Sequence, residues 1–345
     1  MTKRLQHLLF ALSFAASPPV AAEPASSPAG AGEVAKAAVR AFDKLFGGPH
    51  AGHRAVHAKG VLTEGDFIPS EAAGSLSRAD HFQASVPVVV RFSDFAGIPA
   101  VADGAGVASP RGMAIKFMLR DGGETDIVAH SYDGFPVATG EAFVGFLRGL
   151  ADPDPAVLRT FLASHPAAQT FLDAPKPAPA SYATERFFGV NAFRFTNMAG
   201  ASRFGRYRLE PVAGAAHLTA EQAAGRSPDY LAAELRERLV NGPAEFRLLV
   251  QLAAASDDVL DGSKAWPDDR MTVDAGVIRL TRLVPDSETA QRNLLFTPLS
   301  LVAGIAPSGD PLLVARSRSY RPSFDRRRDD QDRKPAAAAP NGPGQ

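Results

Sequence analysis

The chain of 345 residues carries 37 basic and 37 acidic side chains, and 45% of its residues are hydrophobic, which is typical of a globular protein. A net charge of zero and a pI near 7.1 argue against nucleic acid or an anionic membrane surface as a partner, because both attract proteins with clustered excess lysine and arginine. The lack of cysteine excludes disulfides and thiolate-bound cofactors, so a metal or cofactor must use histidine, tyrosine or carboxylate ligands.

The first residues have the pattern of a secretory signal. Lys3 and Arg4 precede an apolar run over residues 8–16, and Ala22 occupies a small-residue position before Glu23. The apolar run is too short for a membrane span, which needs about 20 residues. We therefore expect a signal peptide over residues 1–22, cleavage after Ala22 and, in a bacterium, a periplasmic protein.

Two further segments lack the large apolar side chains that form a core. Residues 23–32 predict a flexible linker, and residues 329–345, which include the string KPAAAAPNGPGQ, predict a disordered tail. Residues 33–328 remain as one large domain. No repeat with a period of 20 to 50 residues occurs, which disfavours solenoids and propellers.

Residues 33–328 begin with an amphipathic helix. Val34, Val39 and Phe42 lie broadly on one helical face, and the string Gly47-Gly48-Pro49 ends the helix. Apolar periodicity predicts three more helices, over residues 140–151, 155–164 and 227–240.

Seven segments have the composition and alternation of β-strands. They cover residues 86–92, 113–119, 126–129, 187–195, 204–209, 245–252 and 276–284. In the sixth, Phe246 and Leu248 face one way and Arg247 the other, as a half-buried strand requires. Closure into a barrel would remove exposed edges. The sequence therefore predicts an α+β protein with a closed antiparallel β-barrel and appended helices.

Two motifs place polar side chains beside these strands. In the string that runs from Arg54 to Gly60, His57 is a candidate catalytic residue, although a lone histidine is more often structural. In the strand over residues 86–92, Arg91 and the following Ser93 share one face. We expect both to point into the space enclosed by the barrel, and a solvated outer face is the alternative.

A third motif lies near the C-terminus. Asp310 can cap a helix whose first turn tolerates Pro311, and Pro322 is expected to end it. Arg316 and Tyr320 are four residues apart and share one helical face, where a guanidinium stabilises a phenolate. A tyrosinate is a suitable ligand for ferric iron. The alternative is that the arginine and the tyrosine form an ordinary surface pair.

Together, these motifs resemble the haem catalases, and more closely the catalase-related peroxidases, a minimal exported subgroup. The resemblance rests on the string R-x-V-H-A-K-G from Arg54, the string V-R-F-S followed by Ala96-Gly97, the Pro110-Arg111-Gly112 turn and the R-x-x-x-Y pair. It runs from about residue 50 to residue 328.

The resemblance implies haem b (iron protoporphyrin IX) as cofactor and a role for each matched residue. His57 would be the distal catalytic base, Ser93 would fix its tautomer, and Tyr320 would be the proximal iron ligand. Arg54, Arg91 and Arg327 would bind the haem propionates, and Arg316 would stabilise the phenolate of the iron ligand. Val56 would narrow the path to the iron. Phe135 and Phe143 would form aromatic walls around the haem. Because Arg327 has arginine on both sides, a solvated charge run is the alternative there.

His130 departs from the family pattern, because full-size catalases have an asparagine at this position that helps to orient peroxide. The resemblance therefore implies that the absence of this asparagine weakens or abolishes catalase activity, in which a second peroxide must reduce the oxidised iron. Cleavage of the first peroxide would still need only His57 and haem. His130 either donates a hydrogen bond in the pocket or turns away and is satisfied by backbone.

We therefore expect a haem peroxidase that reduces hydrogen peroxide or organic hydroperoxides with a small organic electron donor. Rearrangement of fatty-acid hydroperoxides on the same haem scaffold is one alternative, which the 22 phenylalanines would suit. A non-enzymatic haem-binding barrel in the periplasm is another. The chain lacks the wrapping segments of larger catalases, so we expect a monomer or homodimer.

Overall fold

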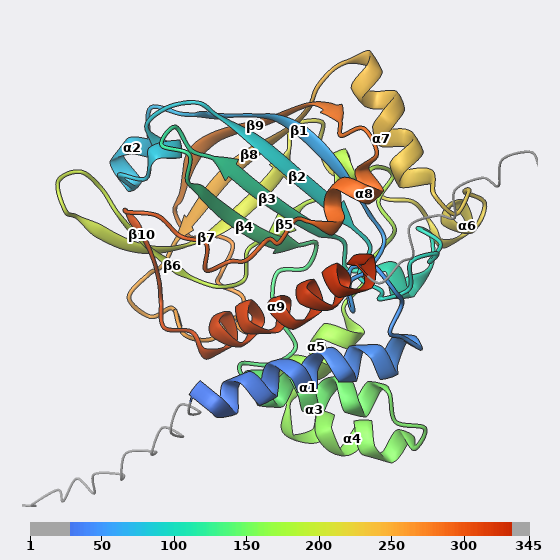
Figure 1. Ribbon diagram of the computed structural model, residues 1–345. Coiled ribbons are helices and arrows are strands. Elements are labelled where there is room, and N and C mark those ends of the chain that lie inside the picture. The colour runs from blue at the N-terminus through green and yellow to red at the C-terminus, as the bar shows by residue number, and fades with distance from the viewer. Residues whose placement is uncertain (1–27, 333–345) are drawn as a thin grey trace, which may run out of the picture.

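The computed structural model describes residues 28–332, and within them eight antiparallel strands close into a barrel (Figure 1). In order around the barrel, the strands are β1 (Gly60–Pro69), β2 (Val86–Ser93), β3 (Gly112–Met118), β4 (Glu124–His130), β5 (Phe187–Phe188), β7 (Ser202–Pro211), β8 (Ala244–Leu252) and β9 (Thr272–Leu283). Pairing of β7 with β8 completes the ring, and β6 (Phe193–Thr196) and β10 (Ile305–Pro307) extend the sheet beyond β7. The predicted α+β class and closed barrel are confirmed.

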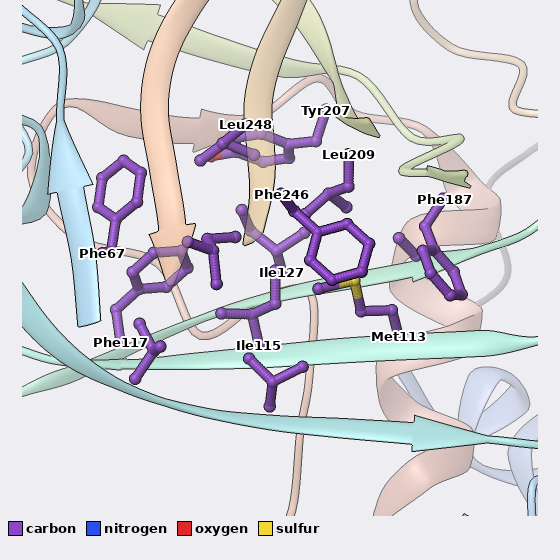
Figure 2. Packing of buried hydrophobic residues seen from close by; sticks show 14 of the residues in the cluster. Phe67, Met113, Ile115, Phe117, Ile127, Phe187, Tyr207, Leu209, Phe246 and Leu248 are labelled. Atoms are coloured by element: carbon purple, nitrogen blue, oxygen red, sulfur yellow. The ribbon is translucent and has the colours of Figure 1, made fainter. Parts of the chain in front are cut away.

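Alternate side chains of the strands fill the barrel interior. The ring of Phe92 stacks on Tyr182 with 5.2 Å between centroids and packs against Phe187 and Phe246. Figure 2 shows the aliphatic and aromatic side chains of this cluster, which is continuous across the strands. The interior is therefore a predominantly apolar core, and the side chains that alternate with this cluster along each strand point outward.

Five helices lie together on one side of the barrel (Figure 1): α1 (Pro28–Phe46), α3 (Gly140–Leu150), α4 (Pro155–Ser164), α5 (Pro166–Asp173) and α9 (Pro311–Asp332). The other helical segments are α2 (Ala73–Leu76), α6 (Ala220–Ala224), α7 (Tyr230–Asn241), α8 (Ser287–Arg292) and short 3-10 turns at Asp80–Phe82, Gly106–Ala108 and Tyr182–Thr184. No helix within residues 28–332 is long and apolar enough to cross a membrane.

The ends of the described chain differ from the sequence predictions. Helix α1 begins at Pro28, so residues 28–32 are helical instead of a flexible linker. Helix α9 runs past Pro322 to Asp332, so residues 329–332 are helical instead of part of a disordered tail. The expected signal peptide and the remainder of both terminal segments lie outside the described residues.

Tertiary contacts explain why α9 continues beyond Pro322, which removes a backbone hydrogen bond from the helix. Arg326 forms an ion pair of 2.6 Å with Asp43 of α1. The backbone N–H of Gly52 donates to the Asp330 carboxylate at 2.9 Å. The turns after the proline are thus anchored to α1 and to the segment that follows it.

The expected strand over residues 187–195 is interrupted. It forms β5 and β6, which are separated by residues 189–192. The interruption turns the side chain of Asn191 toward α9, where its Nδ2 donates to Asp310 at 2.6 Å.

Candidate active site

A cavity lies between the outer face of the barrel and helices α1, α3 and α9. It contains about 1480 Å³ of space that no atom fills, including its open mouth. Its lining includes every site residue expected from the sequence: Arg54, Val56, His57, Arg91, Ser93, Phe135, Phe143, Arg316, Tyr320 and Arg327. The structure thus brings residues far apart in the chain to one place, while the role assigned to each stays a prediction.

The sheet side of the cavity is formed by β2, β3 and β4. Cross-strand pairing places Ser93 beside Gly112 and Gly112 beside His130, and all three line the cavity. Phe92, which precedes Ser93 in β2, and Met113, which follows Gly112 in β3, belong to the barrel core. The expectation that Arg91 and Ser93 point into the barrel is therefore wrong. The interior is packed, and the site lies on the outer face beneath the helices.

His57 is held by contacts on several sides. Its backbone has a φ of 56°, which is uncommon for a residue other than glycine, and its N–H donates to the Phe95 carbonyl at 2.8 Å. The hydroxyl of Ser93 lies 3.1 Å from Nδ1 of the ring, and Phe95 meets the ring edge to face at 5.6 Å. These contacts leave Nε2 as the ring nitrogen that is not engaged by Ser93.

Gly112 also lines the cavity, although its sequence motif predicts only a turn. A Cβ at this position would lie 2.6 Å from the Ser93 hydroxyl and 2.9 Å from Nδ1 and Cε1 of His57. Only glycine leaves room for this pair. Glycine inside a strand often marks such a close approach, and this was the available signal.

Burial lowers the pKa of His57 to about 3, and the positive charges of Arg91 and Arg316 act in the same direction. The imidazole is therefore neutral at physiological pH. A neutral imidazole with a free Nε2 can accept a proton from a bound molecule.

A chain of hydrogen bonds positions Arg316 on α9. Its guanidinium donates to Oδ1 of Asn191 at 2.6 Å, and Asn191 donates in turn to Asp310. Asp310 also accepts the N–H of Leu312 at 2.8 Å, which caps the first turn of α9. Sequence reasoning missed Asn191, because nothing in its local sequence links it to a helix more than a hundred residues away.

Tyr320 lines the cavity one helical turn beyond Arg316. Within residues 28–332, no protein group forms a hydrogen bond with its phenol oxygen. The same part of the chain contains no cluster of three or more histidine, aspartate or glutamate side chains that could hold a metal ion. A metal bound by Tyr320 would therefore bring most of its ligands with it, as iron does in a porphyrin.

Three arginines at the cavity wall share backbone and amide partners. Arg54 and Arg327 both donate to the carbonyl of Leu294, at 3.0 and 3.3 Å, and Arg91 donates from Nε to Oε1 of Gln291 at 2.7 Å. Across the described residues, none of the three arginines forms an ion pair with a carboxylate.

This arginine cluster, Arg54, Arg91 and Arg327, is electrostatically uncompensated. Burial lowers the pKa of Arg91 to about 9 and that of Arg327 to about 10, and neighbouring arginines add to both effects. The pKa of Arg54 also falls well below its ordinary value, through burial and the charges of Arg91 and Arg327. Buried cations are costly without counter-charges, so the cluster favours a ligand with anionic groups at this wall.

The structure also separates the three adjacent arginines near the C-terminus. Arg327 is 3% exposed and lines the cavity, Arg326 pairs with Asp43, and Arg328 is exposed. A solvated charge run is therefore not the explanation for Arg327.

His130 is 8% exposed and lines the cavity, and neither of its ring nitrogens has a hydrogen-bond partner within residues 28–332. Burial lowers its pKa to about 3, assisted by the charge of Arg316. The alternative in which this histidine turns away and is satisfied by backbone is therefore wrong.

The residues present fit haem. The arginine cluster supplies positive charge for two propionates, aromatic side chains such as Phe135 and Phe143 supply apolar walls, and Tyr320 supplies a free phenol oxygen. The Arg316 guanidinium lies 5.6 Å from the Phe135 ring centroid, which joins the α9 side of the cavity to its aromatic wall.

Comparison with known proteins points to one family. The family description named Catalase matches residues 44–329. A catalase-related peroxidase of Mycolicibacterium paratuberculosis (strain ATCC BAA-968 / K-10) is 38% identical over 79% of this chain and 88% of its own length. A catalase-related peroxidase of Synechococcus elongatus (strain ATCC 33912 / PCC 7942 / FACHB-805) is 31% identical over 81% of this chain and 85% of its own length. These matches confirm the resemblance drawn from the sequence.

The crystal structure of a fungal catalase has the same fold. It superposes with a TM-score of 0.71 at 25% sequence identity and covers 80% of this chain. This chain spans 59% of the fungal catalase chain.

Proposed function

This chain belongs to the catalase family, and from that premise we propose that it is an exported haem b peroxidase, which reduces hydrogen peroxide or organic hydroperoxides with electrons from a small organic donor. Family membership makes it a peroxide-acting oxidoreductase and implies haem. The haem type, the donor, the weak catalase activity and the periplasmic location are parts of the proposal.

The chain's own residues have distinct tasks in this proposal. Tyr320 would bind the iron, and the arginine cluster would hold the propionates. When bound, haem supplies the redox centre that passes electrons between donor and peroxide. His57 accepts the peroxide proton at Nε2 and holds it, while the Ser93 hydroxyl at Nδ1 keeps the ring in the orientation needed for this transfer.

The observation that carries the proposal is the state of His57. It is a neutral, fixed imidazole in a cavity that also contains a free phenol and an arginine cluster without counter-charge. A proton acceptor in the same cavity as a possible iron ligand and the arginine cluster supports an enzyme that transfers protons at a bound haem. A protein that only stores haem would not need this proton acceptor.

The N-terminal pattern over residues 1–22 supports export. His130 supports weak or no catalase activity, because it stands where the larger catalases have an asparagine. We further propose a monomer or homodimer.

The test loads the full chain with hemin and follows hydrogen peroxide consumption with and without phenolic or aromatic-amine donors. We expect donor-dependent consumption and little oxygen release. His57→Ala should retain haem and lose the reaction, and His81→Gln, at a buried histidine outside the cavity lining, should retain both. Haem uptake with no peroxide consumption in the wild type would instead support a storage protein, and an unimpaired His57→Ala protein would contradict the role of His57.

A second candidate, rearrangement of fatty-acid hydroperoxides, is favoured by the phenylalanines that line the cavity: Phe42, Phe95, Phe135, Phe143, Phe146 and Phe171. Apolar walls of this kind suit a long hydrocarbon chain. Product analysis with linoleic acid hydroperoxide in the absence of a donor separates the two functions. Rearranged product would support this second candidate, and unchanged hydroperoxide would favour the peroxidase.

A further inference from the structure

The chain has few side chains that can lose a single electron to a strong oxidant. It contains 5 tyrosines, 1 tryptophan and no cysteine. Tyr320 is the proposed iron ligand, and four of the other rings are buried: Tyr182, Tyr207, Tyr230 and Trp266. The remaining ring is that of Tyr132, which is partly exposed. Tyr132 is therefore the side chain of this kind that a molecule in solution can reach without entering the cavity.

Tyr132 packs against the wall of the cavity without lining it. It lies in the segment that joins β4 to α3, and its ring meets Phe171 of α5 edge to face with 5.0 Å between the ring centroids. Phe171 lines the cavity, as do His130 and Phe135 on either side of Tyr132 in the chain. The Phe171 ring thus contacts Tyr132 and also borders the space in which we propose that haem binds.

Lys176 holds the two rings together. Its Nζ lies 4.4 Å from the ring centroid of Phe171 and 5.1 Å from that of Tyr132, and it donates to the carbonyl of Ala174 at 3.0 Å. A cation near an aromatic ring is attracted to the electrons of the ring. The charge of Lys176 therefore fixes the pair, and it also makes a Tyr132 that has lost an electron a stronger oxidant.

The phenol of Tyr132 keeps its proton at neutral pH. Burial and the charge of Asp133 raise the pKa of Tyr132 above its ordinary value of 10.0. Within residues 28–332, no protein group forms a hydrogen bond with its oxygen. A proton that leaves this phenol when the ring is oxidised therefore passes to water at the surface.

We propose that Tyr132 is a redox relay through which phenolic donors at the protein surface deliver electrons to the haem. This inference rests on the proposed function. Tyr132 gives one electron to the haem that peroxide has oxidised and its phenol proton to water, which leaves a neutral tyrosyl radical. The donor then transfers a hydrogen atom to this radical, so that the donor O–H bond breaks and the Tyr132 O–H bond forms again. Two such rounds supply the two electrons and two protons that convert hydrogen peroxide into two water molecules.

The experiment mixes the hemin-loaded full chain with hydrogen peroxide in the absence of a donor. Electron paramagnetic resonance of frozen samples detects the radical, and ring-deuterated tyrosine in the protein identifies it as tyrosyl. A nitroso spin trap, followed by mass spectrometry of the digested protein, locates the radical in the chain.

Tyr132→Phe removes the phenol and keeps the ring. Tyr207→Phe is the matched control, because Tyr207 belongs to the barrel core and does not line the cavity (Figure 2). The haem content and Soret band of each variant establish that it is loaded. A second measurement follows the oxidation of guaiacol, a phenolic donor, at saturating hydrogen peroxide.

We expect a tyrosyl radical and a spin-trap adduct at Tyr132 in the wild type and in Tyr207→Phe. Tyr132→Phe should carry no adduct at this position. Its rate of guaiacol oxidation should fall about tenfold, which corresponds to about 1.4 kcal/mol in activation free energy, because guaiacol must then reach the haem through the cavity. Tyr207→Phe should oxidise guaiacol as fast as the wild type.

The outcomes distinguish a failure of the relay from a failure of the proposed function. If the loaded wild type oxidises guaiacol but carries no adduct at Tyr132, the relay is wrong and the peroxidase stands. If Tyr132→Phe loses the adduct and still oxidises guaiacol at the wild-type rate, Tyr132 is a site of side oxidation and the relay is again wrong. A wild type that takes up no hemin, or that consumes no peroxide, overturns both.

Discussion

Gly112 lies directly against the ring of His57, so that a single methyl group at Gly112 would come within 2.9 Å of Nδ1 and Cε1. The strand β3 thus limits the position of the imidazole that we propose as the base, which belongs to a different segment of the chain. Only glycine at this position leaves room for the Ser93 hydroxyl and Nδ1 of His57 to keep their 3.1 Å contact.

Gly112→Ala is therefore expected to displace the His57 ring while leaving the arginine cluster and Tyr320 in place. The peroxidase kcat/KM should fall on the order of 100-fold, the cost of misplacing a reacting group by about 1 Å, with haem uptake retained. Gly106→Ala is the control, because a Cβ there meets nothing within 4 Å. Equal activity of the two variants would contradict the steric argument.

For the arginine cluster, we expect one substitution to change haem affinity and the stability of the haem-free protein in different directions. Arg327→Met removes a buried cation that has no carboxylate partner, so the melting temperature of the haem-free protein should stay unchanged or rise. Haem affinity should fall about tenfold with the loss of one propionate contact. Hemin titration and thermal unfolding of the haem-free protein measure the two effects.

The neighbouring Arg326 serves as the matched control for this pair of measurements. Arg326→Met breaks the ion pair with Asp43 and should lower the melting temperature by about 1–3 °C, with no change in haem affinity. The account of the cluster would be wrong if Arg327→Met destabilised the haem-free protein as Arg326→Met does and bound haem like wild type.

The pH dependence of the reaction with peroxide follows from the pKa of His57. Its ordinary value is 6.5, and burial together with Arg91 and Arg316 lowers the pKa to about 3. The base is therefore already neutral throughout the range above about pH 4. Stopped-flow rates should be flat from pH 8 to pH 5, and an inflection near pH 6.5 would show that the ring is not shielded in this way.

The pKa of His130 leads to a prediction about stability. Between pH 6.5 and 3 the unfolded chain takes up a proton at His130 that the folded protein does not, so the free energy of unfolding falls as the pH falls through this window. Between pH 7.5 and 4.5 this residue alone accounts for a loss of about 2–3 kcal/mol.

The loss should be missing from His130→Asn, so the haem-free variant should lose less stability than wild type between the two pH values. The pKa values of Asp94 and Asp126 are raised by burial to about 7 and about 6 and oppose the histidines, but they contribute equally to both proteins. Urea unfolding at pH 7.5 and 4.5 measures the difference, and identical losses in the two proteins would refute it.

The sequence predicted the barrel because most strands alternate cleanly, but it missed β1. Its Glu64-Gly65-Asp66 segment breaks the apolar alternation where the pairing with β9 shifts register by one residue. Irregular pairing of this kind leaves no periodic signal. The predicted end of helix α9 at Pro322 was wrong for a different reason. Proline is a strong local signal for the end of a helix, but here contacts with α1 hold the turns that follow it.

Short motifs singled out residues that the structure brings together in one cavity, but they did not predict on which face of the barrel the cavity lies. Alternation shows that Arg91 and Phe92 face opposite ways, but it does not show which face is the barrel interior. That choice depends on helices α1, α3 and α9, which cover the outer face. Gln291 and Asn191, which bind Arg91 and Arg316, lie in segments without a motif and are brought there only by the complete fold.

The central claim is that Tyr320 binds the iron of a haem in this cavity. The absorption spectrum of the hemin-loaded wild type and of Tyr320→Phe, recorded side by side, tests it most directly. The account predicts one haem per wild-type chain, and loss of haem or a displaced Soret band in the variant. A colourless wild type, or a fully loaded variant whose spectrum equals that of the wild type, would contradict it.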